Sequence, residues 1–213
     1  MLVRDRMSVD VPTLSPDNTL LKAMNLVQQK GIRYLPVVDG KKVVGMVTEH
    51  DVRKAGSSDA SSLSIYELNY LLDKVKVSKF MTKKVITVLP QEPIEVAAKK
   101  IYDHKIGALP VVEKNELVGL ITSADILETF IEVLGINEPS VRLELELENR
   151  TGALADAAKI LKDLGLYLVS VITLPRQEGK KTRSTVFRVQ PTDEKKLKDH
   201  LRSVGSPIVS VLG

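Results

Sequence analysis

The segment YLPVVDGKKVVGMVTEHD at residues 34–51 returns as ALPVVEKNELVGLITSAD at residues 108–125, which is 74 residues further along the chain. A repeat of this kind fixes the architecture before any other feature is considered. Two copies in one register predict a pseudo-two-fold module with a cleft between its halves, and such a cleft is a natural place for a ligand. The match continues toward the N-terminus, where Met7, Val11, Thr13, Pro16, Ala23 and Ile32 recur as Met81, Val85, Thr87, Pro90, Ala97 and Ile106.

Each copy predicts the same series of elements. Apolar residues at helical spacing predict a helix that Gly31 ends, and Asp39-Gly40 predicts a hairpin between two β-rich stretches. For the first copy we expect a strand at 11–14, a helix from 20, strands at 34–38 and 43–47 and a helix from Thr48. For the second copy we expect a strand at 85–88, a helix over 93–105, a hairpin around 114–115 and a helix from 123.

The composition of the 213 residues narrows the class of protein. Apolar residues make up 43% of the chain, enough to bury a core, while charged residues make up 27% and interleave to a net charge of +4. This pattern favours a solvated mixed surface over a nucleic-acid partner, and only 4% of residues are aromatic. No cysteine is present, which excludes disulfides, thiolate nucleophiles and cysteine-ligated zinc. Without an apolar run of membrane length, we expect a soluble, cytoplasmic protein with no membrane partner.

Two further segments follow from their patterns. Residues 55–62 predict a flexible linker, and Ser64 to Glu67 forms a capping-box pattern that opens an amphipathic helix. We expect this helix to dock on the module, with a partner-binding helix as the alternative. After Gly135 the residues 141–147 alternate strictly, which predicts a half-buried strand. The remaining elements follow the β-α-β-β-α-β order of ferredoxin-like folds. They are expected as a helix over 153–164, strands at 168–174 and 184–190 joined by a hairpin at 177–180, a helix from Thr192 to about Val204 and a strand at 208–212.

These residues carry a family likeness. The duplicated Leu-Pro-Val-Val, Gly and Thr-x-x-Asp landmarks over roughly residues 1–137 resemble a tandem of CBS domains, and Met7 and Met81 stand just ahead of a strand as such repeats often begin. Residues 140–213 resemble an ACT domain through their element order and the turn at 149–154. The whole chain is similar to the bacterial CBS–ACT regulatory proteins of acetoin utilisation. The resemblance implies an α/β (α+β) protein in which a tandem CBS pair, or Bateman module, precedes a ferredoxin-like ACT domain, with domains at 1–62, 63–137 and 138–213.

The Thr-x-x-Asp pairs carry the chemistry. Thr48 and Thr122 open helices whose N-terminal N–H groups and positive dipole end favour anions. Asp51 and Asp125 lie one turn further on, where a carboxylate can accept both hydroxyl protons of a ribose diol. The alternative is a capping box, in which the threonine oxygen accepts a helical N–H and the aspartate reaches back. Both roles are compatible, because a cap also positions the carboxylate.

The resemblance implies an adenosine-nucleotide site in each repeat, for AMP, ADP, ATP or another adenosine derivative. Arg33, His50 and Arg53 stand near the first Thr-Asp pair and can balance a polyphosphate. The second pair lacks them, so we expect Asp51→Ala to weaken binding more than Asp125→Ala; the alternative for His50 is a merely solvated side chain. Carried over residue by residue, the first site comprises Thr13, Tyr34, Leu35, Pro36, Thr48 and Asp51. The second comprises Thr87, Ala108, Leu109, Pro110, Thr122 and Asp125.

The turn before the helix of the C-terminal unit is a second candidate site. ACT domains commonly receive the carboxylate of an amino acid there, at an interface between two copies, so the resemblance implies an amino-acid effector. The alternative, which the residues favour, is a plain turn capped by Asn149 or Thr151. The candidate loop consists of Asn149, Thr151, Gly152, Ala153 and Leu154.

The motifs favour a regulator over an enzyme. Neither a nucleophile elbow, a P-loop nor a zinc-binding HExxH stretch occurs, so we expect no catalytic residue, no catalytic cofactor and no metal site. We expect a ligand-sensing homodimer that binds an adenosine nucleotide and acts on a regulated enzyme. The alternative is a ligand-free structural module for dimerisation.

Overall fold

The computed structural model describes residues 1–56, 65–175, 178–203 and 208–212 and divides the chain into two compact units, Met1–Ile126 and Leu127–Gly213. Of the linker predicted at 55–62, residues 57–62 lie outside the described residues, as does Ser64 of the predicted capping box. The first two residues of that prediction are wrong, because Ala55 and Gly56 end the helix α2 (Glu49–Gly56). Within the described part of the chain, no helix is long and apolar enough to cross a membrane. The domain boundaries drawn from the sequence after residues 62 and 137 stay predictions.

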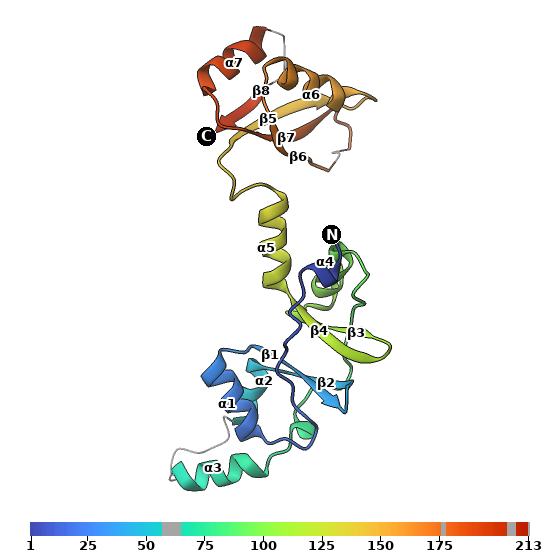
Figure 1. Cartoon of the computed structure of the whole chain (residues 1–213), viewed down its shortest axis with the longest axis vertical. Coiled ribbons are helices and arrows are strands. Elements are labelled where there is room, and N and C mark those ends of the chain that lie inside the picture. The colour runs from blue at the N-terminus through green and yellow to red at the C-terminus, as the bar shows by residue number, and fades with distance from the viewer. Residues whose placement is uncertain (57–64, 176–177, 204–207, 213) are drawn as a thin grey trace. The chain divides into compact units, whose positions relative to one another are not determined.

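The first unit contains both copies of the repeat in one four-stranded sheet (Figure 1). The strand order is β1-β2-β4-β3, and the central strands β2 and β4 pair at the single position Lys42↔Glu116. Lys42 and Glu116 are themselves equivalent in the repeat, so the pseudo-two-fold runs between them. The first copy forms α1 (Leu20–Lys30), β1 (Tyr34–Asp39), β2 (Lys42–Thr48) and α2 (Glu49–Gly56). The second forms α4 (Ile94–His104), β3 (Ala108–Glu113), β4 (Glu116–Thr122) and α5 (Ser123–Val133), and α5 contains the boundary with the second unit.

The two copies exchange their N-terminal segments. The 3-10 turn η1 (Val3–Asp5) places Val3 in the core of the second copy, and the turn η2 (Val77–Lys79) places Val77 in the core of the first. The backbone hydrogen bonds are equivalent: the N–H of Val3 donates to the carbonyl of Glu92 at 3.0 Å, and that of Val77 to Asn18 at 2.8 Å. The repeats are therefore interlocked, and neither core is complete without a segment of the other copy.

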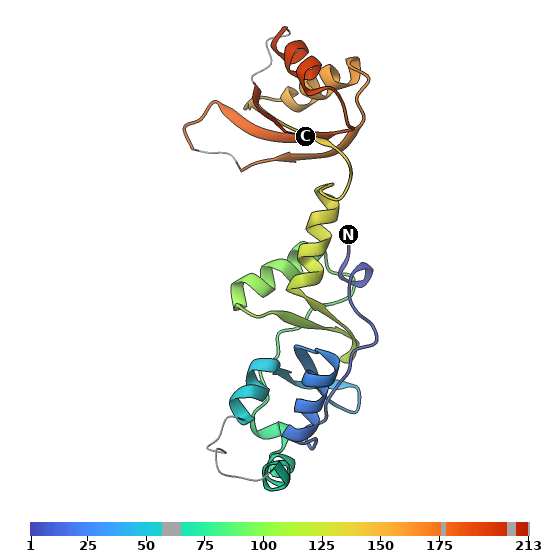
Figure 2. The same cartoon turned by 90° about the vertical axis from the view of Figure 1, so that its left-hand side faces the viewer.

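Local chemistry sets the element boundaries. The Oγ1 atom of Thr19 accepts the N–H of Lys22 at the start of α1, and Gly31 ends this helix in the left-handed region at φ 63°. The helix α3 (Ile65–Lys74) lies beside α1 in both views (Figure 2). Leu72, which is 6% exposed, and Val75 pack into the core of the first copy. This packing agrees with the predicted docking of the linker helix.

The strands predicted at 11–14 and 85–88 are wrong. Each is a single parallel bridge, Leu14↔Val37 in the first copy and Val88↔Val111 in the second. A parallel ladder uses the N–H of every second residue, and past the bridges the next N–H would belong to Pro16 or Pro90. Because proline has no N–H, neither bridge extends toward the C-terminus. Toward the N-terminus, within the strand predicted for the first copy, the next N–H would belong to Pro12, which removes that donor too.

The second unit has the predicted β-α-β-β-α-β order. Its four-stranded sheet has the order β6-β7-β5-β8 with antiparallel neighbours, which is the ferredoxin-like arrangement, and α6 and α7 lie on one face (Figure 2). The alternating strand β5 turns Val141, Leu143 and Leu145 into the core against Phe187. The elements are β5 (Val141–Glu148), α6 (Ala153–Asp163), β6 (Leu168–Thr173), β7 (Thr182–Val189), α7 (Glu194–Ser203) and β8 (Ile208–Leu212).

The predicted start of the last helix at Thr192 is corrected by two residues. The carboxylate of Asp193 accepts the N–H groups of Lys195 and Lys196 at 2.9 and 3.1 Å, so Asp193 caps the helix and α7 begins at Glu194. Val204, the predicted end of this helix, and Gln177 of the predicted hairpin lie outside the described residues.

Candidate functional site

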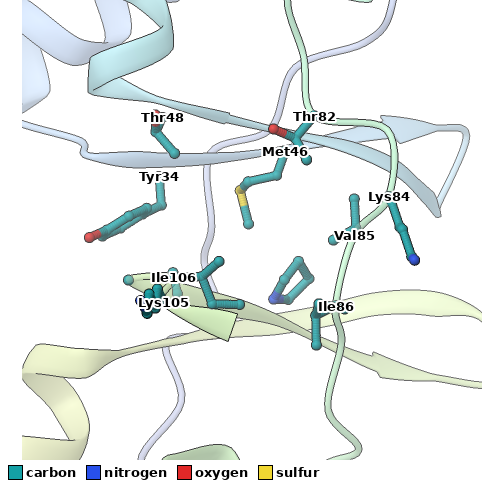
Figure 3. A pocket seen from close by; sticks show the side chains of 12 residues that line it. Tyr34, Met46, Thr48, Thr82, Lys84, Val85, Ile86, Lys105 and Ile106 are labelled. Carbon is teal, nitrogen blue, oxygen red and sulfur yellow. The ribbon is translucent and has the colours of Figure 1, made fainter. Parts of the chain in front are cut away.

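Two clefts lie between the copies in the first unit, and the repeat relates one to the other. The β1–β2 and β3–β4 hairpins pair at Lys42↔Glu116, and beyond that position the buried side chains of Met46, Ala108 and Leu120 pack between them. The Thr48 cleft, of about 230 Å³, lies between them (Figure 3). It is lined by Tyr34, Met46 and Thr48 of the first copy and by Thr82, Lys84, Val85, Ile86, Lys105, Ile106, Gly107, Ala108 and Pro110 of the second.

The Thr122 cleft is the pseudo-equivalent space and measures about 270 Å³. Leu120 and Thr122 hold here the positions that Met46 and Thr48 hold in the other cleft, as their spacing of 74 residues requires. Its walls thus again combine one copy's Thr-x-x-Asp strand with the other copy's segment before the Leu-Pro-Val-Val strand. The lining residues are Gly31, Ile32, Arg33, Tyr34, Leu120, Thr122, Ser123 and Ala124.

Both Thr-x-x-Asp pairs form capping boxes, as the alternative reading predicted. Asp51 Oδ2 accepts the N–H of Thr48 at 2.9 Å and its hydroxyl at 2.7 Å, and the N–H of Asp51 donates to Thr48 Oγ1 at 3.2 Å. The pair Thr122 and Asp125 repeats these bonds at 2.7, 2.8 and 3.3 Å. A hydroxyl has one proton, so in this state each threonine donates to its own aspartate. Both bonds to Asp51 end on Oδ2, and its Oδ1 atom stands outside the cap.

The grouping of site residues by repeat is corrected. The sequence placed Tyr34 with Thr48 and placed Ala108 and Pro110 with Thr122, whereas Ala108 and Pro110 line the Thr48 cleft together with Tyr34. Each cleft takes its threonine from one copy and its opposite wall from the other. The physical reason is the facing arrangement of the two hairpins, which a pattern within one copy does not reveal.

The cations are also distributed differently. Arg33, expected beside Thr48, lines the Thr122 cleft, while Lys84 and Lys105 line the Thr48 cleft. Arg53 lines a separate groove between α1 and α2 and pairs with Glu49 at 3.7 Å. It stays a prediction that Asp51→Ala weakens nucleotide binding more than Asp125→Ala. The reason changes, because two lysines border the Thr48 cleft and one arginine borders the Thr122 cleft.

The remaining predicted residues stand outside the two clefts. Leu35 and Leu109 are fully buried in the cores of their own copies, so their side chains face other core residues. Pro36 is buried, Thr13 and Thr87 are half-buried, and the carbonyl of Thr87 accepts Lys100 Nζ at 3.1 Å. His50 is exposed, as its solvated alternative predicted. Neither Asp51 nor Asp125 is among the lining residues of the clefts. Each aspartate is connected to its cleft by the hydrogen bond from the lining threonine, Thr48 or Thr122.

Sequence reasoning missed most of the second wall of the Thr48 cleft. Thr82, Lys84, Val85 and Ile86 follow the repeated Met81, and their segment is bound to β2: Met46 and Thr82 exchange two backbone hydrogen bonds of 2.9 Å. The repeated methionine was the available signal, because it marks where each exchanged segment enters the other copy.

The candidate loop of the second unit is a turn held by side chains. Gly152 takes the N-cap position of α6 at φ 85°, and no side chain caps this helix, so neither Asn149 nor Thr151 is the predicted cap. Instead the Asn149 amide donates to the carbonyls of Lys180 and Thr182 at 3.2 and 3.4 Å, because it lies beside the start of β7.

A cation lies over this loop. Arg150 donates to Asp156 Oδ2 and Glu148 Oε2, both at 2.7 Å, and these two carboxylates raise the pKa of its guanidinium. Ala153 and Leu154 form the first turn of α6, and Leu154 is 44% exposed. Among the residues that the structure describes, no cluster of histidines and carboxylates could hold a metal ion.

Comparison with known proteins gives consistent relatives for the repeats. The chain is 33% identical over 130 residues to homoserine O-acetyltransferase of Methanococcus vannielii, which covers 60% of this chain and 24% of that enzyme. The chain thus spans about a quarter of the length of this curated relative. Among solved structures, AcuB of Vibrio cholerae, named as an acetoin utilization protein, matches with 33% identity and a TM-score of 0.54, covering 65% of this chain and 96% of AcuB.

A second solved structure carries ligands. The CBS domain pair of protein MJ0100, in complex with 5′-methylthioadenosine and S-adenosyl-L-methionine, matches with 30% identity and a TM-score of 0.51 over 61% of this chain and 95% of that pair. The CBS domain family itself matches residues 3–58 and 77–132, which are the two copies of the repeat together with their exchanged segments. The chain therefore belongs to the CBS-domain proteins, and its first unit is a tandem CBS pair.

Proposed function

We propose that the protein is a regulatory sensor that binds an adenosine derivative in the clefts of its CBS pair. The observation that carries the proposal is the pair of equivalent clefts, each with apolar walls, a cation at its border and a helix N-terminus next to its threonine. The ligands of the MJ0100 pair, 5′-methylthioadenosine and S-adenosyl-L-methionine, support an adenosine compound as the class of ligand.

The walls of the Thr48 cleft suit the parts of a nucleotide. Met46, Val85, Ile86 and Ile106 offer apolar surface for a purine base. The ribose hydroxyls can donate to Asp51 Oδ1, which the cap leaves available without releasing Thr48. Lys84 and Lys105 favour a phosphate and disfavour the sulfonium cation of S-adenosylmethionine, because like charges repel. We therefore propose a phosphorylated adenosine, AMP, ADP or ATP, as the preferred ligand.

A thermal-shift panel tests this function. A ligand that binds only the folded form stabilises it by about 2.7 kcal/mol when present at roughly 100 times its dissociation constant. We expect AMP, ADP or ATP to raise the melting temperature more than S-adenosylmethionine, with GMP as the base control. If none of the adenosine compounds moves the melting temperature, the sensor proposal is wrong and the ligand-free structural module takes its place.

For the second unit we propose an ACT domain that joins two chains and passes on the state of the clefts. Its ferredoxin-like sheet and its exposed edge residues Val171 and Leu212, 38% and 59% exposed, support pairing of sheets between two copies. A homodimer follows, and light scattering that gives a monomer at micromolar concentration would contradict it. An amino-acid effector at the 149–154 loop is the second candidate ligand, tested by adding amino acids to the same panel.

The regulated partner is proposed from the similarity of this chain to a solved structure. AcuB of Vibrio cholerae carries the name of an acetoin utilization protein, which supports a regulated enzyme of acetoin metabolism as the partner. A regulatory role without catalysis is proposed because the sequence contains no nucleophile elbow, P-loop or HExxH stretch, and a cytoplasmic location is proposed with it. Turnover of ATP by the purified protein would contradict it.

A further inference from the structure

Tyr34 lines both clefts. It begins β1, and Figure 3 shows its ring pointing away from that strand into the Thr48 cleft, toward the wall that carries Lys105 and Ile106. The residue at the equivalent position of the second copy is Ala108. The pseudo-two-fold therefore places an aromatic ring on one side of the module and a methyl group on the other.

The missing side chain of Gly107 leaves room for the Tyr34 ring. A Cβ atom added to Gly107 would collide with the hydroxyl and the ring of Tyr34, so the ring lies directly against bare backbone. The equivalent of Gly107 in the first copy is Arg33, whose long side chain belongs to the Thr122 cleft. The two copies therefore differ at two neighbouring positions, Arg33/Gly107 and Tyr34/Ala108, and both differences change the space around the Tyr34 ring.

We infer that the Tyr34 ring is a shared wall that makes the two clefts compete, so that a ligand in one weakens binding in the other. The inference rests on the proposed function. The two clefts, of about 230 and 270 Å³, share Tyr34 as a lining residue, and its ring lies against the backbone of Gly107. A ligand that pushes the Tyr34 ring out of its own cleft moves the ring into the other cleft and reduces the space there. A ligand that instead binds the ring in its own cleft takes the ring away from a ligand in the other cleft. Such a differential contact is what couples two sites.

Isothermal titration calorimetry of the full chain with ATP, AMP and 5′-methylthioadenosine tests the coupling. For the wild type we expect two binding steps, the second about 5- to 150-fold weaker than the first. Tyr34→Ala places at residue 34 the side chain of its counterpart Ala108, and we expect its two affinities to approach each other. Tyr34→Phe keeps the ring, so it should keep the separation between the two steps.

Tyr102→Ala is the matched control, because this tyrosine is 82% exposed and lines neither cleft. It should titrate as the wild type does. Melting of the unliganded variants checks that each one folds. Two equal steps in the wild type, or an unchanged ratio in Tyr34→Ala, overturn the inference and leave the sensor function intact. Loss of all binding in Tyr34→Ala but not in Tyr34→Phe also overturns it, since the ring would then be a ligand contact. If wild type and all variants bind none of the probes, the proposed function itself fails.

Discussion

The sulfur of Met81 lies 2.5 Å from the point that a Cβ atom on Gly45 would occupy. Met7 and Gly119 repeat this relationship at 2.8 Å. Each methionine belongs to one copy of the repeat and each glycine to the other, so these landmarks meet across the module and not within a copy. Glycine recurs here because the exchanged segment runs directly over the strand, where it pairs as Met46↔Thr82 and Ser8↔Leu120.

Alanine at the two glycines should have unequal effects. At Gly119 the nearest atom to a new Cβ is the backbone oxygen of Ser8 at 2.7 Å, whereas at Gly45 it is the end of a flexible methionine. We expect Gly119→Ala to lower the free energy of unfolding by about 1–3 kcal/mol, and Gly45→Ala by less. Urea unfolding measures both. Gly56→Ala is the control, because its Cβ meets only Met24 at 3.7 Å; a loss as large as that of Gly119→Ala there would contradict the argument.

The exchanged N-terminal turn should stabilise the second copy. Val3 is fully buried among Val88, Ile94 and other core residues of that copy. We expect Val3→Ala to lower the free energy of unfolding by about 2 kcal/mol, since two buried carbon atoms are removed. Val9→Ala, at a side chain that is 65% exposed, should change it little. Equal urea midpoints for the two variants would show that the turn does not hold the module together.

Much of this fold follows from local pattern. Gly31, Asp39-Gly40 and the alternation of 141–147 mark elements that the structure contains, because caps, turns and strand periodicity act over a few residues. The pseudo-two-fold was also accessible, since an ungapped repeat fixes it. The strands at 11–14 and 85–88 are reduced to single bridges. Pro12 removes a ladder donor within the first of them, and Pro16 and Pro90 block extension past the bridges.

The sequence pattern of one copy could not predict which residues of the other copy line its cleft. Val3 and Val77 are apolar residues just ahead of the repeated methionines, and that position does not say which of two similar cores will hold them. The same gap misplaced Arg33, which belongs to the same copy as Thr48 but lines the cleft of Thr122. Two homologous halves offer two pairings with the same local signals, and only packing between them decides.

The stability of the second copy should depend on pH through Glu92. Its carboxylate accepts the N–H of Leu89 at 2.6 Å and contacts Lys100 Nζ at 3.0 Å. Burial raises the pKa of Glu92, but the Leu89 N–H and the Lys100 ammonium outweigh it and hold the pKa below its ordinary value. A lowered folded-state pKa gives stability that is complete above the unfolded-state pKa of about 4.3 and is lost as pH falls through the folded-state pKa.

Glu92→Gln removes this charge and should reduce the free energy of unfolding by about 0.5–1 kcal/mol at pH 7, with the difference vanishing at a pH below the folded-state pKa. Urea unfolding at a series of pH values measures it. Asn18 is the equivalent residue of the first copy, and its amide oxygen accepts the Ser15 N–H at 2.9 Å without a charge. Asn18→Ala should therefore lose the same stability at both pH values. A pH-independent difference for Glu92→Gln would contradict the ionic origin.

The lysines of the Thr48 cleft should distinguish phosphorylated from neutral ligands. Lys84 lines this cleft, whereas the adjacent Lys83, which is also exposed, does not. An exposed ion pair contributes up to about 1 kcal/mol, so Lys84→Ala should weaken ATP binding by about fivefold and leave 5′-methylthioadenosine, which has no phosphate, unchanged. Lys83→Ala should alter neither affinity, since its charge acts only at a distance that salt screens. Calorimetry in 0.15 M salt measures all four affinities. An equal loss of both ligands in Lys84→Ala would mean that the lysine shapes the wall and does not neutralise a phosphate, and an equal effect of Lys83→Ala on ATP would replace a specific contact with the general charge of the surface.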